Sequence, residues 1–408
     1  MIIYYILLFA LFLHVSNSYR NKIPCFRPPH AEQSDKEESD KGNFTLSYQG
    51  DPITIACVTN SQQYNFYLIK VTENIPSFLV KELSSNGRGL SLLYHGIGNL
   101  ITMPNGLLFQ FAKEWYQASG KNICIISYAY STDRTTTGFQ IIKHLNKMVK
   151  TNRLDFVAWQ IRDLVSRVRF QCIRSRKKSC LNSLSQVDIS GFSFGAHLAS
   201  RTCQFLKDEL GEKVQMLLAL DPSKTPPLVK KPKNTITRGD ANYVHVLHTS
   251  DLGISKSIGH VDVYVKYKAK TLTEWINDKH ALAMYLHVAI ASKRLYLIAD
   301  KDGKGKGIVI QGNGQNVPNP TPNQCVVGIY SVPPPSMDLT KGKEFVVHIT
   351  DRDILRNSLQ KYANPDLFFE YYESPRQSLD QDIILTNRGK SSQWEEASSS
   401  NLYGRGNI

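Results

Sequence analysis

A serine that could act as a nucleophile stands in the segment QVDISGFSFGAH, residues 186–197. A short β-branched run precedes Ser193 and an apolar helical pattern follows it, so we expect a sharp turn from strand to helix at this residue. Such a turn exposes the serine hydroxyl above the edge of a sheet. Gly191 and Gly195 leave the room that the turn and the close packing of the helix require. The pattern therefore predicts a nucleophile at position 193.

An acidic partner is expected after the serine, at the end of the next strand. The segment MLLALDP, residues 216–222, is an apolar run that ends in Asp221. Asp221 could simply be a helix N-cap or a turn residue before Pro222. Its distance from Ser193 leaves room for one helix and one strand, and this spacing favours the acid of a Ser-Asp-His triad.

Three histidines after Asp221 are candidates for the base. His248 follows an apolar run and is expected to end a strand with a structural hydrogen bond. His260 lies in a GHVD segment and could pair with Asp262. His280 follows a polar loop and leads into the apolar helix ALAMYLHVAIAS, whose own His287 we expect to be a packing residue. A catalytic histidine needs a loop position from which its ring reaches both partners, which favours His280 over His260.

Five motifs follow one another in the chain: GFSFGAH, LALDPSKTPP, DANYVHVLHTS, IGHVDVY and DKHALAMYLHVAIAS. In this order they resemble the motifs of the pancreatic-lipase-like family, which includes triacylglycerol lipases, phospholipases A1 and yolk-type relatives without the catalytic serine. The similarity extends from about Asn65 to about Thr350. It implies an α/β-hydrolase fold and hydrolysis of carboxylic esters in lipids, with Ser193 as nucleophile, Asp221 as acid and His280 as base.

The same resemblance implies an oxyanion hole made of two backbone amides. One would belong to Ile97, which follows an HG pair in the segment SLLYHGIGN, and the other to Phe194, the residue after the nucleophile. Two amides directed at the developing negative charge contribute a few kcal/mol, roughly, to transition-state stabilisation. The HG pair could also be an ordinary turn after a strand.

The segment that would form the lid is short. Only VKYKAKTLTEWI separates Tyr264 from Asn277, which resembles the phospholipase-type members of the family. Lys266, Lys268 and Lys270 in this segment are interleaved with aromatic residues, which suits a phosphate-bearing lipid surface but also a solvated loop. An open basic rim favours phospholipase A1 activity over triacylglycerol lipase activity, because charge attraction would hold an anionic lipid surface.

The N-terminal sequence predicts secretion. Residues 1–18 form an apolar run followed by small residues, as in a signal peptide, with an uncleaved anchor as the alternative because no basic residue precedes the run. Residues 19–45 form a polar, mobile leader that contains a glycosylation sequon at Asn43. We therefore expect an extracellular glycoprotein.

Cysteine spacing suggests one disulfide. The chain has 7 cysteines, so one would remain unpaired if all the others formed bridges. Cys172 and Cys180 flank a short basic loop and are the first candidates for a pair by proximity.

Alternating strand and helix patterns predict a mostly parallel sheet covered on both faces by helices. One helix is expected across 154–171, and a single catalytic domain across 46–350. A polar tail, 351–408, is too short for the C-terminal lipid-binding sandwich of pancreatic lipases, so no colipase-type partner is implied. The expected strands lie near 89–94, 122–128, 186–190, 215–220 and 243–248.

The formal net charge of +14 agrees with a partner that carries negative charge, but also with ordinary lysines on loops and helix surfaces. No nucleic-acid recognition motif accompanies the charge, and no cofactor or metal motif is present, so we expect neither a nucleic-acid partner nor a cofactor. The prediction is a secreted serine ester hydrolase that acts on lipids or phospholipids at a membrane or micelle surface. The alternative is a catalytically weak lipid-binding or storage protein on the same fold.

Overall fold

The computed structural model places most of the region that the motifs span. It describes residues 52–59, 66–72, 74–96, 107–128, 143–148, 151–175, 180–224, 236–267, 279–301, 308–311, 319–334, 338, 340–349 and 357–359. The helices and strands are β1 (Ile53–Val58), β2 (Phe66–Val71), α2 (Ser77–Ser85), β3 (Leu90–Tyr94), α3 (Leu107–Ser119), β4 (Asn122–Ser127), α5 (Arg153–Ser175), η1 (Leu184–Gln186), β5 (Val187–Phe192), α6 (Gly195–Leu210), β6 (Val214–Leu220), β7 (Ala241–His248), β8 (Val261–Tyr267), α7 (Lys279–Ala291), β9 (Leu295–Asp300), β10 (Ile308–Gln311), β11 (Gln324–Val326) and β12 (Lys343–Ile349).

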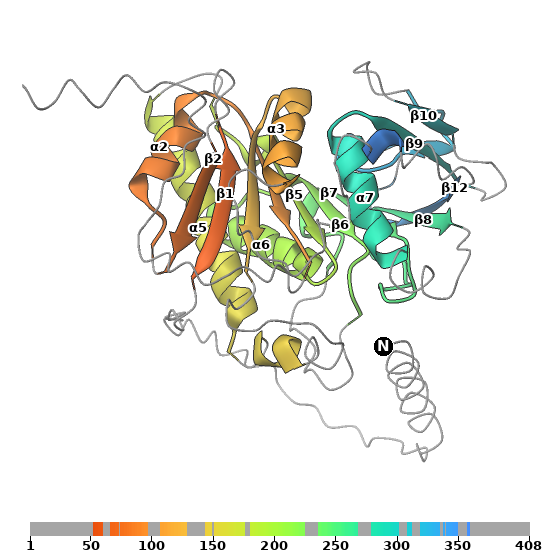
Figure 1. Ribbon diagram of the computed structural model, residues 1–408, viewed down its shortest axis with the longest axis horizontal. Helices are drawn as coiled ribbons and strands as arrows, with labels where there is room; N and C mark the ends of the chain where they lie inside the picture. Colours follow the sequence, from red (N-terminus) through yellow and green to blue (C-terminus); the bar gives the residue numbers. More distant parts are fainter. Residues whose placement is uncertain are drawn as a thin grey trace, which may run out of the picture.

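The strands form one sheet that extends across the molecule from β2 to β10 (Figure 1). The strand order is β10-β9-β12-β8-β7-β6-β5-β3-β4-β1-β2, with β11 paired to β9 outside this path. From β4 to β12 every neighbouring pair is parallel, whereas the pairs at both edges are antiparallel. The parallel centre is buried on both faces and reads as nearly continuous apolar sequence, which explains why its strands could be recognised.

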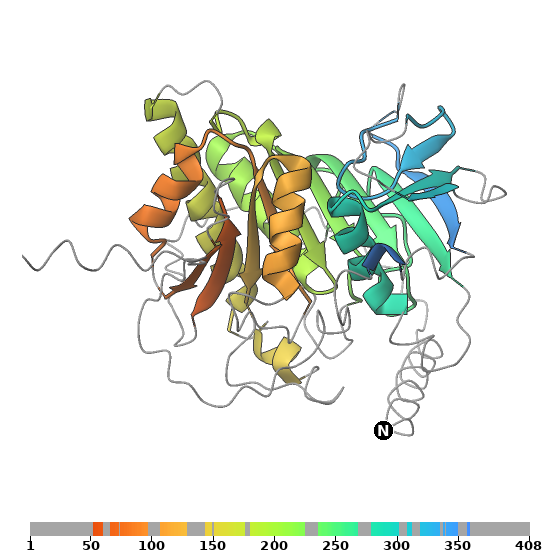
Figure 2. The same cartoon turned by 45° about the horizontal axis from the view of Figure 1, so that its top comes forward.

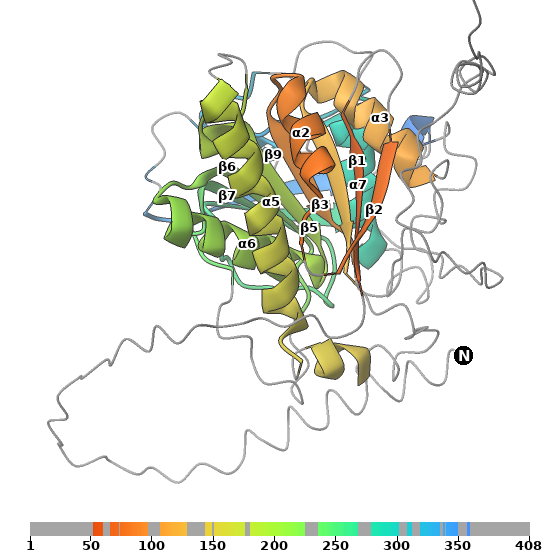
Figure 3. The ribbon, with the colours of Figure 1, turned by 90° about the vertical axis from the view of Figure 1, so that its left-hand side faces the viewer.

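Helices cover both faces of the sheet. One apolar cluster joins α2, α5 and α6 to one face, and a second cluster joins α3 and α7 to the other. Figure 3 shows these two layers on opposite sides of the strands, and Figure 2 shows α3 and α7 next to each other on their face. Side chains alternate between the faces, so Leu92 belongs to the first cluster and Leu93 to the second. This arrangement is the α/β-hydrolase fold, as the sequence predicts.

The predicted strands and the long helix are confirmed, with boundaries that differ by a few residues. On α5, the five residues that the pattern placed on one face are all buried: Val157, Ile161, Leu164, Val165 and Val168. The next helix, α6, ends at Gly211, whose φ of 66° is left-handed and whose amide donates to the Lys207 carbonyl.

Two disulfides connect described residues. The Cys172–Cys180 bridge confirms the pair expected from proximity, and it closes the loop after α5. A second bridge, Cys57–Cys124, joins the antiparallel strands β1 and β4 and has no signal in the spacing of the sequence. Cys203 and Cys325 are both free and buried, so more than one cysteine lacks a bridge.

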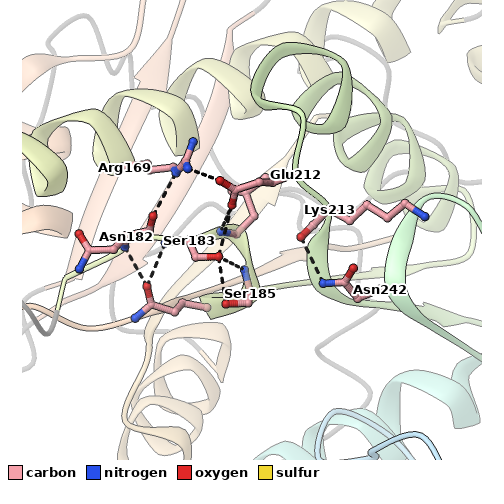
Figure 4. A network of polar contacts seen from close by, with 9 residues as sticks. Arg169, Asn182, Ser183, Ser185, Glu212, Lys213 and Asn242 are labelled. Atoms are coloured by element: carbon pink, nitrogen blue, oxygen red, sulfur yellow. Dashed lines mark hydrogen bonds and ion pairs between the residues drawn. The ribbon is translucent and has the colours of Figure 1, made fainter.

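A polar network fixes α5 to the start of β5, at the edge of the sheet where the parallel strands begin (Figure 4). The Arg169 guanidinium forms an ion pair with Glu212, whose second carboxylate oxygen accepts from the Ser183 hydroxyl at 3.3 Å and the Leu184 amide at 3.2 Å. The turn between α6 and β6 is thereby tied to the turn before β5. Nearby, the Asn242 amide donates to the Lys213 carbonyl at 3.5 Å and joins β7 to the same edge.

The signal peptide predicted at 1–18, the leader at 19–45 and most of the tail at 351–408 lie outside the described residues. Among the helices that the structure does describe, none has both the length and the apolar character needed to cross a bilayer. The domain limits at 46 and 350 stay predictions.

Candidate active site

The predicted nucleophile lies at the turn between β5 and α6. Ser193 has a left-handed backbone with a φ of 57°, and its side chain is 7% exposed. Its amide donates to the Leu220 carbonyl at 2.9 Å, and its carbonyl accepts from the amides of Ala196 and Ser223, each at 3.2 Å. These bonds hold the strained residue between the end of β6 and the first turn of α6.

The two glycines of the motif permit close contact between backbones. A side chain on Gly195 would collide with the carbonyl oxygens of Tyr94 and His95 at the end of β3. A side chain on Gly191 would collide with the backbone of Gly195 itself. Substitution of either glycine would therefore push α6 away from the sheet, and the turn at Ser193 would open.

The predicted acid is fully buried at the end of the neighbouring strand. Asp221 also has a left-handed backbone, with a φ of 43°, and its amide donates to the Leu247 carbonyl of β7 at 2.7 Å. Its carboxylate accepts the amides of Thr249 at 2.9 Å and Ser250 at 3.2 Å through Oδ1. The hydroxyl of Ser250 donates to Oδ2. Asp221 is thus held in place by the turn that follows β7.

His280, the second residue of α7, lies between the serine and the aspartate. Its Nε2 accepts from the Ser193 hydroxyl at 2.9 Å, and its Nδ1 donates to Asp221 Oδ2 at 2.6 Å. The ring also packs on Phe192, with ring centres 4.8 Å apart, and its side chain is 20% exposed. The three predicted residues therefore form a continuous hydrogen-bonded chain, which is the geometry required for transfer of the serine proton.

Of the two residues predicted to supply oxyanion amides, Phe194 is among the described residues. Phe194 caps the N-terminus of α6. Amides at this position precede the intrahelical hydrogen bonds and can bind an anion. Ile97 lies outside the described residues. Just before it, the Nδ1 of His95 donates to the Gly96 carbonyl at 2.8 Å, and burial lowers the pKa of this ring to about 4, so it is neutral at neutral pH.

The alternative base, His260, lies away from the serine and the aspartate. Its Nδ1 accepts from the Val244 amide at 2.8 Å, so the ring bonds the middle of β7. Asp262, its expected partner, instead binds His248, with 2.9 Å between Asp262 Oδ1 and His248 Nε2. His248 has the structural hydrogen bond expected at a strand end, and the pairing of His260 with Asp262 is wrong.

Two further predictions concern side chains outside the triad. His287 is 1% exposed and packs edge-on against Phe111 and Trp115, so it is a core residue as expected. In the lid segment, Lys266 is exposed at the end of β8, and Lys268 and Lys270 lie outside the described residues.

Sequence reasoning missed the contribution of Ser250 to the site. Its amide and hydroxyl supply half of the hydrogen bonds that reach the Asp221 carboxylate. The only signal in the sequence is the position of the His-Thr-Ser triplet directly after a strand. That signal is weak, because serine is common in turns for its own local hydrogen bonds.

Comparisons with known proteins relate this chain to lipases and phospholipases A1. The sequence profile of the family described as Lipase matches residues 112–268, which include Ser193 and Asp221. A phospholipase A1 of Vespula squamosa is 23% identical over 221 residues, which cover 53% of this chain and 68% of the relative. A phospholipase A1 of Vespula vulgaris is 25% identical over 266 residues, which cover 64% of this chain and 71% of the relative.

A shorter match has higher identity. The protein called phospholipase A1 2 of Polistes dominula is 39% identical over 88 residues, which are 21% of this chain and 27% of the relative. The alignment thus spans only about a quarter of that relative's length. One solved structure, the α/β-hydrolase MGS-M1 from a deep-sea metagenome library, is 15% identical and covers 50% of this chain and 73% of its own. Its TM-score of 0.27 is too low to support a fold assignment, so we assign the fold from the strand order.

The strand order and the strand-to-helix turn at Ser193 define an α/β-hydrolase. The family profile and the matching relatives narrow this class further. They support a carboxylic ester hydrolase that resembles the lipases and phospholipases A1 of the pancreatic-lipase-like family.

Proposed function

We propose that this lipid ester hydrolase is a phospholipase A1 in which Ser193, His280 and Asp221 form the catalytic triad. The observation that carries the proposal is the relay of two hydrogen bonds from the Ser193 hydroxyl through the His280 ring to Asp221. An uncharged serine is a weak nucleophile, and a base in hydrogen-bond contact with it provides the activation that ester attack requires.

The reaction would take two steps. His280 Nε2 takes the proton as Ser193 Oγ attacks the ester carbonyl, and Asp221 stabilises the resulting imidazolium through Nδ1. The amides of Phe194 and Ile97 would bind the negative oxygen of the tetrahedral intermediate. His280 then gives its proton to the departing alcohol oxygen, which leaves the lysophospholipid free and the acyl group on Ser193. In the second step water, activated by the same ring, releases the fatty acid.

The preference for phospholipid rests on charge near the site and on the names of the relatives. Lys224, Lys256 and Lys266 are exposed on segments that follow or adjoin the carboxyl ends of β6, β7 and β8, the edge at which the triad lies. The formal net charge is +14. A basic rim of this kind attracts a surface of anionic lipid head groups, and it gives no comparable advantage on a droplet of neutral triacylglycerol. Several matching relatives are called phospholipase A1.

Secretion forms part of the proposal. The predicted signal peptide at 1–18, the sequon at Asn43 and the two disulfides fit an oxidising, extracellular compartment. A catalytically weak storage protein on the same fold remains the competing function. The hydrogen-bonded relay favours an enzyme, because a storage role needs no contact between Ser193 and His280.

The test is fatty-acid release by purified protein from anionic phosphatidyl-lipid vesicles and from triolein emulsion, each at low and high salt. We expect release from vesicles to exceed release from triolein and to fall as salt rises, because the Debye length shortens from about 10 Å at 0.1 M to about 3 Å at 1 M. The variant Ser193→Ala should release no fatty acid from either substrate. Preference for triolein without salt dependence would identify a triacylglycerol lipase, and absence of turnover in the wild type would favour the storage protein.

A further inference from the structure

The Asp221 carboxylate accepts four hydrogen bonds, and two of them come from one residue outside the triad. Thr249 and Ser250 donate their amides to Oδ1 at 2.9 Å and 3.2 Å. The Ser250 hydroxyl and His280 Nδ1 both donate to Oδ2, the latter at 2.6 Å. Ser250 therefore contacts both carboxylate oxygens, so it restrains rotation of the carboxylate about its Cβ–Cγ bond.

The orientation of the Ser250 hydroxyl is determined by its other neighbours. The Leu252 amide donates to Ser250 Oγ at 3.2 Å and occupies one lone pair of the oxygen. The single hydroxyl proton is then available for Asp221 Oδ2. Ser250 Oγ also lies 3.4 Å from His280 Nδ1, so the hydroxyl, the carboxylate oxygen and the imidazole nitrogen are mutual neighbours.

The loop that carries Ser250 wraps around Asp221. Ser223 and Gly253 form an isolated antiparallel bridge, next to which the Ile254 amide donates to the Pro222 carbonyl at 2.8 Å. A side chain on Gly253 would collide with the Asp221 carboxylate, so the loop backbone lies directly against the carboxylate. The position of Asp221 thus depends on the path of this loop.

The side chain of His248 closes the base of the loop. Its Nδ1 lies 2.7 Å from the Ile254 carbonyl oxygen, and its Nε2 lies 2.9 Å from Asp262 Oδ1. The ring therefore connects the backbone of the loop to the Asp262 carboxylate at the start of β8. Burial raises the pKa of Asp262, but the bonds from His248 and from residues 257–258 outweigh it and hold the pKa below its usual range. Tyr264 stacks on the imidazole with ring centres 4.5 Å apart.

We propose that Ser250 is a positioning residue of the active site, which holds Asp221 Oδ2 toward His280 Nδ1, and that the His248–Asp262 pair holds the loop in the conformation that allows this. The proposal rests on the triad of the proposed function. When His280 carries the serine proton, Oδ2 must remain directed at Nδ1, because a rotated carboxylate would leave the imidazolium without its partner. The two bonds from Ser250 oppose that rotation throughout the reaction.

The experiment compares Ser250→Ala, Ser250→Cys and Ser250→Thr with Ser255→Ala, the same type of change at an exposed position of the same loop. On a soluble nitrophenyl ester, Ser250→Ala should lower kcat by about 10- to 100-fold, the effect of losing a hydrogen bond to a charged group. KM should be unchanged, because the hydrogen bonds of Ser250 go to Asp221 and to its own loop. Ser250→Thr keeps the hydroxyl and should restore kcat, Ser250→Cys should be intermediate, and Ser255→Ala should match the wild type.

The pH profile separates positioning from a merely structural effect. Without the Ser250 hydroxyl, Asp221 Oδ2 is less firmly directed at His280 Nδ1 and stabilises the imidazolium less, so the acid limb of kcat/KM should move to lower pH in Ser250→Ala. The low-field proton signal of His280 Nδ1–H, which His280→Ala should abolish, should also move in Ser250→Ala. Ser255→Ala should change neither the acid limb nor the signal. Both readouts can also be taken on Ser250→Cys, should the alanine variant not fold.

The outcomes distinguish this inference from the proposed function. Wild-type kcat, acid limb and proton signal in Ser250→Ala would overturn the role of Ser250 while the triad stands. Hydrolysis that persists in Ser193→Ala would overturn the triad instead. The proton signal would then still decide whether Ser250 orients the Asp221 carboxylate toward His280, because it does not depend on turnover.

Discussion

At the level of single residues, the site places two strained residues at the ends of adjacent strands. Ser193 and Asp221 both have left-handed backbones, which cost on the order of 1–3 kcal/mol for a residue with a side chain. Each strained amide donates to the next strand, Ser193 to Leu220 and Asp221 to Leu247. The strain at each position is therefore offset by a hydrogen bond to the neighbouring strand. Because Leu220 directly precedes Asp221, the bond from Ser193 also fixes the serine and the aspartate relative to each other.

Substitution of the two candidate histidines should have opposite effects on activity and stability. His280→Ala should lower kcat on esters by about 10⁴- to 10⁶-fold, as removal of a triad member does. His260→Ala should keep activity close to wild type but lower the free energy of unfolding by about 1–3 kcal/mol, because the Val244 amide loses its buried acceptor. Steady-state kinetics and urea unfolding on both variants provide the measurement.

The assignment of the base would be contradicted by the reverse pattern. If His260→Ala lost activity with its fold intact and His280→Ala retained it, the proton would have to pass through another route. Circular dichroism on both variants would separate loss of folding from loss of catalysis.

At the level of secondary structure elements, α7 combines a functional end with a core position. His280 stands at its start, and His287, two turns later, is buried between Phe111 and Trp115 of α3. Neither ring nitrogen of His287 has a hydrogen-bond partner among the described residues. Burial lowers the pKa of His287 from an ordinary 6.5 to about 3, so the folded protein keeps this ring neutral.

This buried histidine makes the stability of the protein sensitive to acid. Below about pH 6.5 the unfolded chain binds a proton at His287 that the folded protein does not, so stability falls as the pH falls toward 3. His287→Leu removes this difference. The free energy of unfolding of the variant, relative to that of the wild type, should therefore rise by about 2 kcal/mol when the pH is lowered from 7.5 to 5. Urea unfolding at the two pH values measures the gain.

A control on the same helix keeps the test specific. Met284 is also buried, and Met284→Leu exchanges one apolar side chain for another without a titrating group. Its difference from wild type should be the same at both pH values. If the difference in free energy of unfolding between His287→Leu and wild type were also the same at both pH values, the ring of His287 would have to take up its proton in the folded protein.

The elements that the sequence predicted share one physical property. The strands from β3 to β7 are nearly continuous apolar runs and the helix α5 has a periodic apolar face, so local composition was enough to recognise them. The pairing of other strands is not local: β12 pairs in parallel with β8, and β1 pairs with β4, to which the Cys57–Cys124 bridge joins it. Partners so distant in sequence leave no periodic signal in either segment.

At the level of the whole molecule, the sheet brings together side chains that lie far apart in the chain. His280 is 59 residues from Asp221 and 87 from Ser193 in sequence, but it contacts both. The parallel strands β5, β6 and β7 all end at the same edge, and α7 begins there (Figure 1). The rule that sites form at this edge allowed the triad to be predicted from strand ends and loops.

The part of the site that escaped prediction is the part that depends on three-dimensional contacts alone. Ser250 and Gly253 lie against Asp221, and the His248–Asp262 pair binds their loop, only because the loop after β7 folds back over the end of β6. Their residue types are ordinary for a loop, so neither type nor spacing distinguished them. The competing assignment of Asp262 to His260 failed for the same reason, since adjacency in sequence does not decide pairing across strands.

The most direct test of the central claim is covalent labelling of the nucleophile. The purified protein is treated with a fluorophosphonate, which reacts with activated serines, and the modified peptide is identified by mass spectrometry. The relay from Ser193 through His280 predicts a single adduct on Ser193, with loss of ester hydrolysis in proportion to labelling and no adduct in Ser193→Ala or His280→Ala. Labelling of a different serine, or hydrolysis that continues after Ser193 is fully modified, would contradict the account.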